Sequence, residues 1–225
     1  MADFYLSSSQ IKAVASLVHV APTLTSNEPS ILKSIRIDVT QDSAMAYASD
    51  RKTAARVSFP LSSDETETSV LLSAEDAKRV AATKCGGLFS FEPTGSKRAQ
   101  HVVTFDADLR TAATQPVTLT ADDGNFPPIE RLFPTFKGHD TAEYDLPAGI
   151  GMDLNRLAML GKLSLPGETD KHRREAAWVL NYTGAGHAPG NRILKPVLAT
   201  RGDVLGGKLA VLIQPVHVFK DSAGR

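Results

Sequence analysis

Residue types that often carry out catalysis are present in this chain, but their spacing assembles no catalytic site. The six histidines show no metal-ligand spacing with one another or with the single cysteine, Cys85. The glycine-rich residues 184–190 lack the Lys-Ser/Thr ending of a phosphate-binding loop, and their proline favours a turn. The carboxylates at 65–67 and 122–123 lie in polar stretches of the kind that turns routinely contain. We therefore expect a protein that is not an enzyme and that requires no metal or other cofactor.

Residues 126–134 offer binding chemistry instead. They include three prolines, a charged pair and four large apolar side chains. Proline removes a backbone donor and fixes φ, so this segment is not the middle of a helix or of a central strand. A stiff apolar connector of this type either seals two domains together or forms the wall of a groove.

Composition limits the classes of function. The 25 basic and 25 acidic residues give a formal net charge of zero, which excludes a generally basic nucleic-acid coat but allows a local basic surface. The lone Cys85 excludes a disulfide framework and suits a reducing compartment. Residues 1–10 lack the order of a signal peptide, and no apolar run approaches the length of a membrane span. We therefore expect a soluble, cytoplasmic protein with no membrane partner.

The order of helix-like and strand-like patterns in residues 1–120 predicts one complete α+β domain. Apolar residues at helical spacing predict a helix at about 9–18, and a second helix is predicted to begin at Ser73 as its N-cap. Alternating runs rich in Val, Ile, Thr and Phe predict half-buried antiparallel strands at 31–39, 45–48, 55–59, 69–72, 88–92, 101–105 and 116–120.

After a proline-rich connector at 121–141, residues 142–225 repeat this pattern in a shortened second domain. One helix is predicted to begin at Asp153, with an apolar side formed by Leu154, Leu157, Ala158 and Leu160. A polar linker is predicted at 164–174 and a turn at 184–190. Strands are predicted at 142–146, 176–182, 193–200 and 208–218. A second helix of this domain is either missing or contained in 136–146.

The connector closely resembles the junction motif of the bacterial DNA polymerase sliding clamp (the β clamp), usually written Phe-Pro-Asp-Tyr-x-Arg-Val-Leu-Pro. Residues 48–51, Ala-Ser-Asp-Arg, occupy the place of the family's Ala-Thr-Asp-Gly turn. Residues 71–84 look like the middle domain's second helix, and residues 150–155 are similar to the start of the last domain's second helix. Residues 211–216 look like the family's closing Val-Val-Met-Pro-Met strand. These ordered matches cover nearly the whole chain.

The chain departs from the family pattern at several of these positions. Pro128 and Ile129 stand where Asp and Tyr are usual, Arg51 replaces a glycine, and Gln214 replaces a methionine. The cellular clamp has three domains per chain, and only the last two have counterparts here. The resemblance therefore implies a compact, phage-type clamp with an α+β DNA-clamp fold. This fold has two repeated domains of antiparallel sheets, with helices on the inner face.

In this family, partner proteins insert a short apolar peptide into a groove between the last two domains. Carried over by position, the groove here would be formed by Lys52, Thr53, Ala54, Pro127, Arg131, Leu132, Gln214, Pro215 and Val216. Prolines and short aliphatic side chains make a rigid slot that loses little entropy on binding, and Arg131 can frame the polar end of a peptide. Without the resemblance, the same residues are more typical of plain core at a domain junction.

Several basic residues lie away from the apolar stripes of the predicted helices, namely Lys12, Lys78, Arg79, Lys84, Arg156 and Lys162. The resemblance implies that such helices surround a central hole and contact the phosphates of duplex DNA loosely, without reading sequence. Taken alone, charges on the outer face of an amphipathic helix usually form only a solvated surface.

The resemblance implies a non-enzymatic processivity factor that encircles duplex DNA. It would tether a DNA polymerase and other proteins with clamp-binding motifs, and a clamp loader could serve it. Rings in the wider superfamily have six domains, so two domains per chain predict a head-to-tail homotrimer. One alternative is a monomeric adaptor that binds clamp-seeking peptides without closing a ring. A remote alternative is an enzyme or small-ligand module on the same α+β layout, which predicts a deep polar pocket and no effect on DNA.

Overall fold

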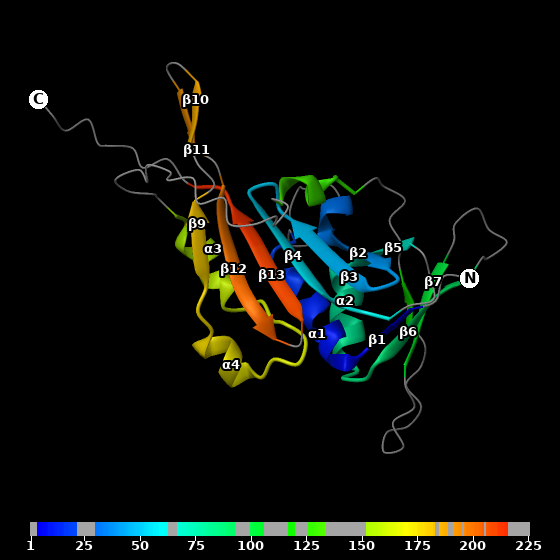
Figure 1. Ribbon diagram of the computed structural model, residues 1–225. Coiled ribbons are helices and arrows are strands. Elements are labelled where there is room, and N and C mark those ends of the chain that lie inside the picture. The colour runs from blue at the N-terminus through cyan, green and yellow to red at the C-terminus, as the bar shows by residue number, and fades with distance from the viewer. Residues whose placement is uncertain are drawn as a thin grey trace, which may run out of the picture.

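The protein is described here from a computed structural model (Figure 1). The structure describes residues 4–21, 30–62, 67–92, 100–105, 117–119, 126–133, 152–182, 185–188, 191–194, 196–204 and 206–215. Antiparallel sheets and short helices make up these residues, as the α+β prediction requires. The predicted strand at 142–146, and the helix considered at 136–146, lie outside the described residues.

A seven-stranded antiparallel sheet forms the centre of the molecule, in the order β5-β2-β3-β4-β13-β12-β9. The first half of the chain supplies β2 (Ser34–Thr40), β3 (Ser43–Ser49), β4 (Thr53–Pro60) and β5 (Glu67–Ser73). The second half supplies β9 (Val179–Tyr182), β12 (Val197–Val204) and β13 (Gly207–Ile213). The two halves meet where β4 pairs with β13, with Ala54 opposite Leu212. We call this junction the β4–β13 seam. The division into two repeated domains stays a prediction.

A smaller four-stranded sheet has the order β1-β6-β7-β8. It consists of β1 (Phe4–Leu6), β6 (Gly87–Glu92), β7 (Gln100–Phe105) and β8 (Val117–Leu119). The last three of these strands confirm predictions, whereas β1 was not predicted because three residues are too few to show an alternating pattern. The rings of Phe4 and Phe89 stack across β1 and β6 with their centroids 5.0 Å apart.

Residues 184–190 are not simply a turn, which corrects the sequence prediction. They contain β10 (Ala185–Ala188), which pairs with β11 (Asn191–Leu194) in a two-stranded antiparallel ribbon. Pairing of the two backbones stabilises an extended conformation that the glycine content of the segment disfavours. The strand predicted at 193–200 is consequently divided between β11 and β12.

The two helices predicted in the first half are confirmed. In α1 (Ser8–Ser16), the Ser7 hydroxyl accepts the backbone N–H of Gln10, and the Gln10 side chain accepts the N–H of Ser7. The chain then tightens into the 3-10 turn η1 (Leu17–His19). Ser73 is the N-cap of α2 (Ala74–Ala82), as predicted, and accepts the N–H of Asp76. A further 3-10 turn, η2 (Ser30–Lys33), occupies the start of the strand predicted at 31–39.

The helices of the second half differ in part from the prediction. Asp153 is the N-cap of α3 (Leu154–Leu160), as predicted, but Leu154 is 79% exposed and Ala158 is also exposed. Leu160 is buried as predicted, together with Met159, and Leu157 packs partly buried against the core, because this short helix contacts the core mainly through its C-terminal half. Residues 164–174 are not a linker but lead into α4 (Asp170–Glu175), which has no buried residue and therefore no apolar stripe to reveal it.

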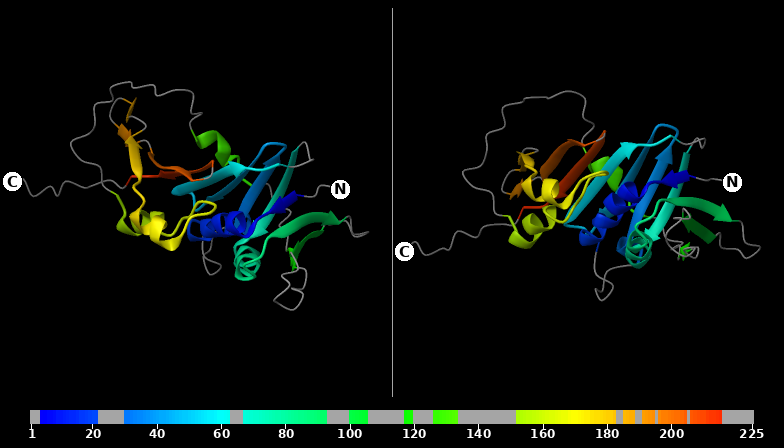
Figure 2. Two further views of the ribbon diagram at one scale, coloured as in Figure 1. Left: turned by 60° about the horizontal axis from the view of Figure 1, so that its bottom comes forward. Right: turned by 90° about the horizontal axis from the view of Figure 1, so that it is seen from below.

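Apolar residues are buried on both faces of the central sheet. One face packs on the helices and on the small sheet, through alternating residues such as Ile37, Val57 and Val211. The other face is covered by residues 126–133, whose Phe126, Ile129 and Phe133 pack on a patch formed by Tyr47, Ala54, Leu198, Ala210 and Leu212. Figure 2 shows α1, α2, α3 and α4 on one side of the sheet and the short green turn of the connector on the opposite side. The two predicted sites therefore lie on opposite faces.

Candidate peptide-binding surface and basic helix face

The connector both covers the sheet and presents side chains to solvent. Its centre is the 3-10 turn η3 (Ile129–Leu132), in which Pro127 accepts the N–H of Ile129 at 2.7 Å. Phe126 and Ile129 point into the apolar patch, whereas Leu132 is 60% exposed and Arg131 is exposed. One short turn can therefore have both of the roles considered for this segment: its buried side chains cover the sheet, and its exposed side chains are available to form the wall of a groove.

Charged and aromatic side chains hold η3 on the sheet. The carboxylate of Glu130 lies 3.9 Å from Arg36, which also donates to Asp38 at 2.7 Å. The Arg56 guanidinium lies 4.9 Å from the centroid of the Phe133 ring. Burial lowers the pKa of Arg56, but its guanidinium remains charged at neutral pH. These contacts fix the connector on both sides, so Leu132 projects from a rigid base.

The turn between β3 and β4 lies at the end of the β4–β13 seam. The Asp50 carboxylate accepts the N–H groups of Lys52 at 3.0 Å and Thr53 at 2.6 Å. Arg51 has a φ of 72°, in the left-handed region that glycine adopts most easily. Here a non-glycine residue takes the same conformation, because Asp50 holds the turn closed.

The structure brings five of the predicted groove residues to one end of the seam. Thr53 and Ala54 begin β4, and Lys52 directly precedes it. The N–H of Gln214 donates to the Lys52 carbonyl at 2.9 Å, and Pro215, the next residue, is buried. The connector carries Pro127, Arg131 and Leu132, and its buried side chains pack on Ala54. Val216 lies outside the described residues. That these residues form a peptide groove stays a prediction.

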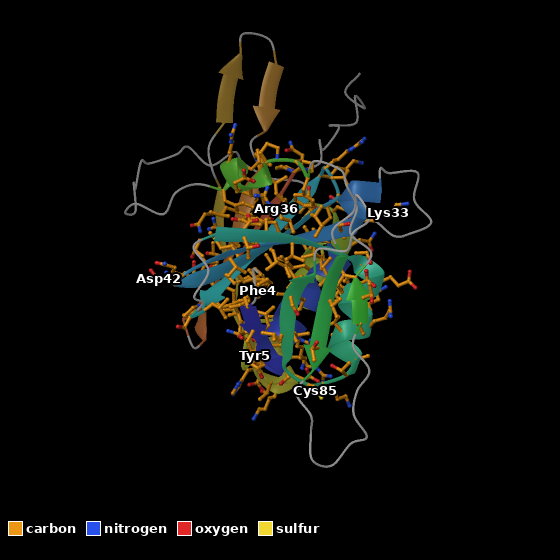
Figure 3. The ribbon with its side chains drawn as sticks, turned by 90° about the vertical axis from the view of Figure 1, so that its right-hand side faces the viewer. Phe4, Tyr5, Lys33, Arg36, Asp42 and Cys85 are labelled. Atoms are coloured by element: carbon orange, nitrogen blue, oxygen red, sulfur yellow. The ribbon has the colours of Figure 1, made fainter. Side chains whose placement is uncertain are left out.

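Sequence reasoning missed a hollow beside the connector. It has a volume of about 350 Å³ and is lined by Arg36, Asp38, Val39, Thr40, Thr68 and Ser69 on β2 and β5. Figure 3 shows Arg36 on the central sheet, close to the connector. The lining residues come from two neighbouring strands, so only the register of that pair brings them together.

The basic residues on the helix side of the sheet differ in whether a carboxylate lies next to them. Lys78, Lys84 and Lys162 are exposed. Lys12 instead pairs with Asp170 at 3.2 Å, and Arg79 pairs with Asp76 at 3.0 Å. Five of the six predicted DNA-facing residues are thus exposed, and two of these five, Lys12 and Arg79, have a carboxylate neighbour.

The pKa of His19 indicates which cations on the helix side of the sheet act at the same place. Its partial burial lowers its pKa below the usual 6.5, and the charges of Lys162, Lys78 and Arg173 lower it further. These three cations come from different elements, and Arg173 lies in the segment that was predicted to be a linker. His19 and Arg173 were missed as candidates because only the packing of the helices brings them next to Lys78 and Lys162.

Arg156 points into the protein, whereas the sequence predicted that it faces DNA. Its side chain is only 18% exposed. The guanidinium donates to both carboxylate oxygens of Asp50, at 3.0 and 3.3 Å, and to the hydroxyl of Thr53. It also lies 3.7 Å from the carboxylate of Asp153. Arg156 therefore binds the turn at the seam.

Among the residues that the structure describes, no three His, Cys, Asp or Glu side chains are grouped so that they could hold a metal ion. Likewise, no helix among these residues has the length and apolar character needed to cross a membrane.

Comparisons with known proteins identify the fold. No family model and no curated protein matches the sequence. The structure is similar to the DNA polymerase III beta chain of Streptococcus pneumoniae, with a TM-score of 0.56 and 12% identity over 97% of this chain. The DNA polymerase III beta subunit of Thermotoga maritima gives 0.54 and 11% over 97%. The chain has a sliding-clamp fold.

The clamp fold confirms the predicted fold class. The DNA polymerase sliding clamp of Bacillus subtilis is a third match, with a TM-score of 0.54 and 12% identity over 96% of this chain. The chain spans 64–66% of the length of these three proteins. The resemblance seen in the motifs is thus confirmed at the level of the fold.

Proposed function

We propose that this protein is a DNA sliding clamp that raises the processivity of a polymerase and binds partner peptides where the connector meets the β4–β13 seam. The observation that carries the proposal is the match of almost the whole chain to solved structures named as polymerase III beta subunits and sliding clamps. Such a protein acts by keeping the polymerase close to its template, which raises the effective concentration without catalysis.

The connector supports peptide binding through its rigidity. Leu132 is exposed, while Phe126 and Phe133 on either side of it are buried, so a peptide can cover Leu132 without ordering the protein first. Burying roughly 500 Å² of apolar surface at ~25 cal/mol per Å² gives on the order of 10 kcal/mol before ordering costs. After these costs a micromolar affinity remains, which suits a platform that several partners share in turn.

An exposed sheet edge supports self-association into a ring. Strand β9 lies at one edge of the central sheet and pairs there with β12. Val179 and Leu180 project to opposite faces of β9 and are 58% and 53% exposed. An apolar edge strand is a template for another strand. We propose that this edge joins the next copy in a head-to-tail homotrimer of two-domain chains.

The opposite face supports loose contact with duplex DNA. The charges of Lys78, Lys162 and Arg173 all act on His19, which indicates a local concentration of positive charge in a chain whose net charge is zero; of these three, Arg173 also lies 3.4 Å from the Asp170 carboxylate. Phosphate contacts of this kind carry no sequence information and weaken as salt concentration rises.

Retention on DNA tests the proposal. The protein is incubated with a closed circular duplex and separated from free protein at moderate salt, with half of each sample linearised beforehand. We expect retention on the circle and loss from the linear form, because a ring slides off free ends. Equal retention on both forms, or none on either in the presence of a clamp loader, would contradict encirclement.

One observation favours the adaptor as a second candidate. Lys12, Arg79 and Arg156 each have a carboxylate neighbour, which reduces the charge available to phosphates on the helix face. A monomeric adaptor would still bind clamp-seeking peptides at the connector. It would, however, show no salt-sensitive affinity for the circular duplex.

A further inference from the structure

We propose that Arg156 is a positioning residue of the candidate peptide-binding surface: it holds the turn at 50–52 from helix α3, on the other side of the sheet. The role in peptide binding rests on the proposed function. The positioning of the turn rests on the contacts of Arg156 alone.

A continuous series of polar contacts connects α3 to the seam. Arg156 donates to both carboxylate oxygens of Asp50, 106 residues away in the sequence. One of those oxygens, Oδ1, also accepts the N–H groups of Lys52 and Thr53. The Lys52 carbonyl in turn accepts the N–H of Gln214. The orientation of Arg156 is thus transmitted through one carboxylate to both strands of the seam.

The turn at 50–52 needs stabilising contacts because a non-glycine residue, Arg51, adopts a left-handed backbone conformation in it. Arg51 holds a φ of 72°, which costs a non-glycine residue energy that the surrounding contacts must supply. The Ser49 hydroxyl supplies part of it by donating to the Thr53 carbonyl at 2.9 Å. Asp50 supplies a further part by accepting the N–H groups of Lys52 and Thr53, and Nη1 of Arg156 donates to both oxygens of that carboxylate and so keeps it in place.

The same geometry argues against Arg156 as a phosphate contact. Its guanidinium is largely buried and has three acceptors of its own chain, from Asp50, Thr53 and Asp153. A phosphate would have to replace these partners, which are already charge-assisted and correctly placed. On the same helix face, Lys162 is exposed and needs no such exchange.

The test combines amide hydrogen exchange with peptide binding in Arg156→Ala, Arg156→Lys and a control, Arg174→Ala, which removes an exposed arginine of α4. The probe is a labelled peptide from the tail of a bacterial replicative DNA polymerase. We expect Arg156→Ala to speed exchange of the Lys52 and Thr53 amides at least tenfold and to weaken peptide binding five- to tenfold. Arg156→Lys should restore part of both effects, because a single ammonium can replace the Nη1 contacts with Asp50 but not the approach of Nε to Asp153. Arg174→Ala should change neither value by more than twofold.

A double-mutant comparison with Asp50→Asn completes the test. If Arg156 acts through Asp50, the double variant should be no worse than the poorer single variant. Exchange rates at Lys52 and Thr53 within twofold of wild type in Arg156→Ala would overturn the positioning role. If wild-type protein fails to bind the peptide while Arg156→Ala still speeds exchange, the positioning role stands and the proposed peptide function fails.

Discussion

Replacing Leu132 by alanine tests the peptide-binding surface at its most exposed apolar side chain. Full burial of a leucine side chain contributes about 1.5–3 kcal/mol. Because 60% of Leu132 is exposed, a peptide that covers it recovers about 0.9–1.8 kcal/mol of that value. With about 1.4 kcal/mol per factor of ten, the loss on truncation corresponds to roughly a 5- to 20-fold weaker affinity. The stability of the fold should change little, since the side chain contributes only its buried part.

The assay is fluorescence anisotropy of the labelled polymerase-tail peptide, with urea unfolding of each variant measured in parallel. Leu154→Ala is the matched control, because Leu154 is 79% exposed and lies on α3, at the other face of the sheet. We expect its affinity for the peptide to equal that of the wild type. A dissociation constant for Leu132→Ala within twofold of wild type, or an equal loss in Leu154→Ala, would refute this surface.

Two further predictions concern charges on the helix side of the sheet. Glu168 and Arg201 form an ion pair that is almost completely buried, so Glu168→Ala should lower the free energy of unfolding by about 3–5 kcal/mol in urea titrations; a loss below about 1 kcal/mol would show that the remaining charge is not buried. The lowered pKa of His19 means that the unfolded chain binds the proton more readily than the folded chain. Stability should therefore be fully present above pH 6.5 and fall as the pH drops below 6.5 towards the folded pKa. His19→Gln should flatten this part of the pH profile, and an unchanged profile would contradict the assignment.

Local signals were sufficient to predict the helix starts and most strands. Ser73 and Asp153 are N-caps as predicted, because capping depends on a side chain and an N–H two or three residues away. The irregular structure of the connector could also be predicted, because its prolines exclude a regular helix or central strand and its large apolar side chains favour burial. The helix α4 also has an N-cap, Thr169, but it was missed because none of its six residues is buried and the segment therefore shows no apolar stripe.

The parts that could not be predicted depend on contacts between distant segments. The side chain of Arg156 looks like any charge beside an apolar stripe, and its partner Asp50 lies 106 residues earlier. Leu154 was assigned to the apolar side of the helix by its spacing, yet α3 contacts the core through Leu157, Met159 and Leu160 and leaves Leu154 exposed. His19 and Arg173 become neighbours only after η1 and α4 pack on the same side of the sheet.

Mass measurement by light scattering after size-exclusion chromatography, over a range of concentrations, tests the central claim most directly. One chain has a mass of 24.1 kDa, so a closed ring of three chains has three times this mass, about 72 kDa. The clamp proposal predicts this value, with dissociation only on dilution. A mass of one chain at every concentration would contradict the ring and leave the monomeric adaptor as the function that the fold supports.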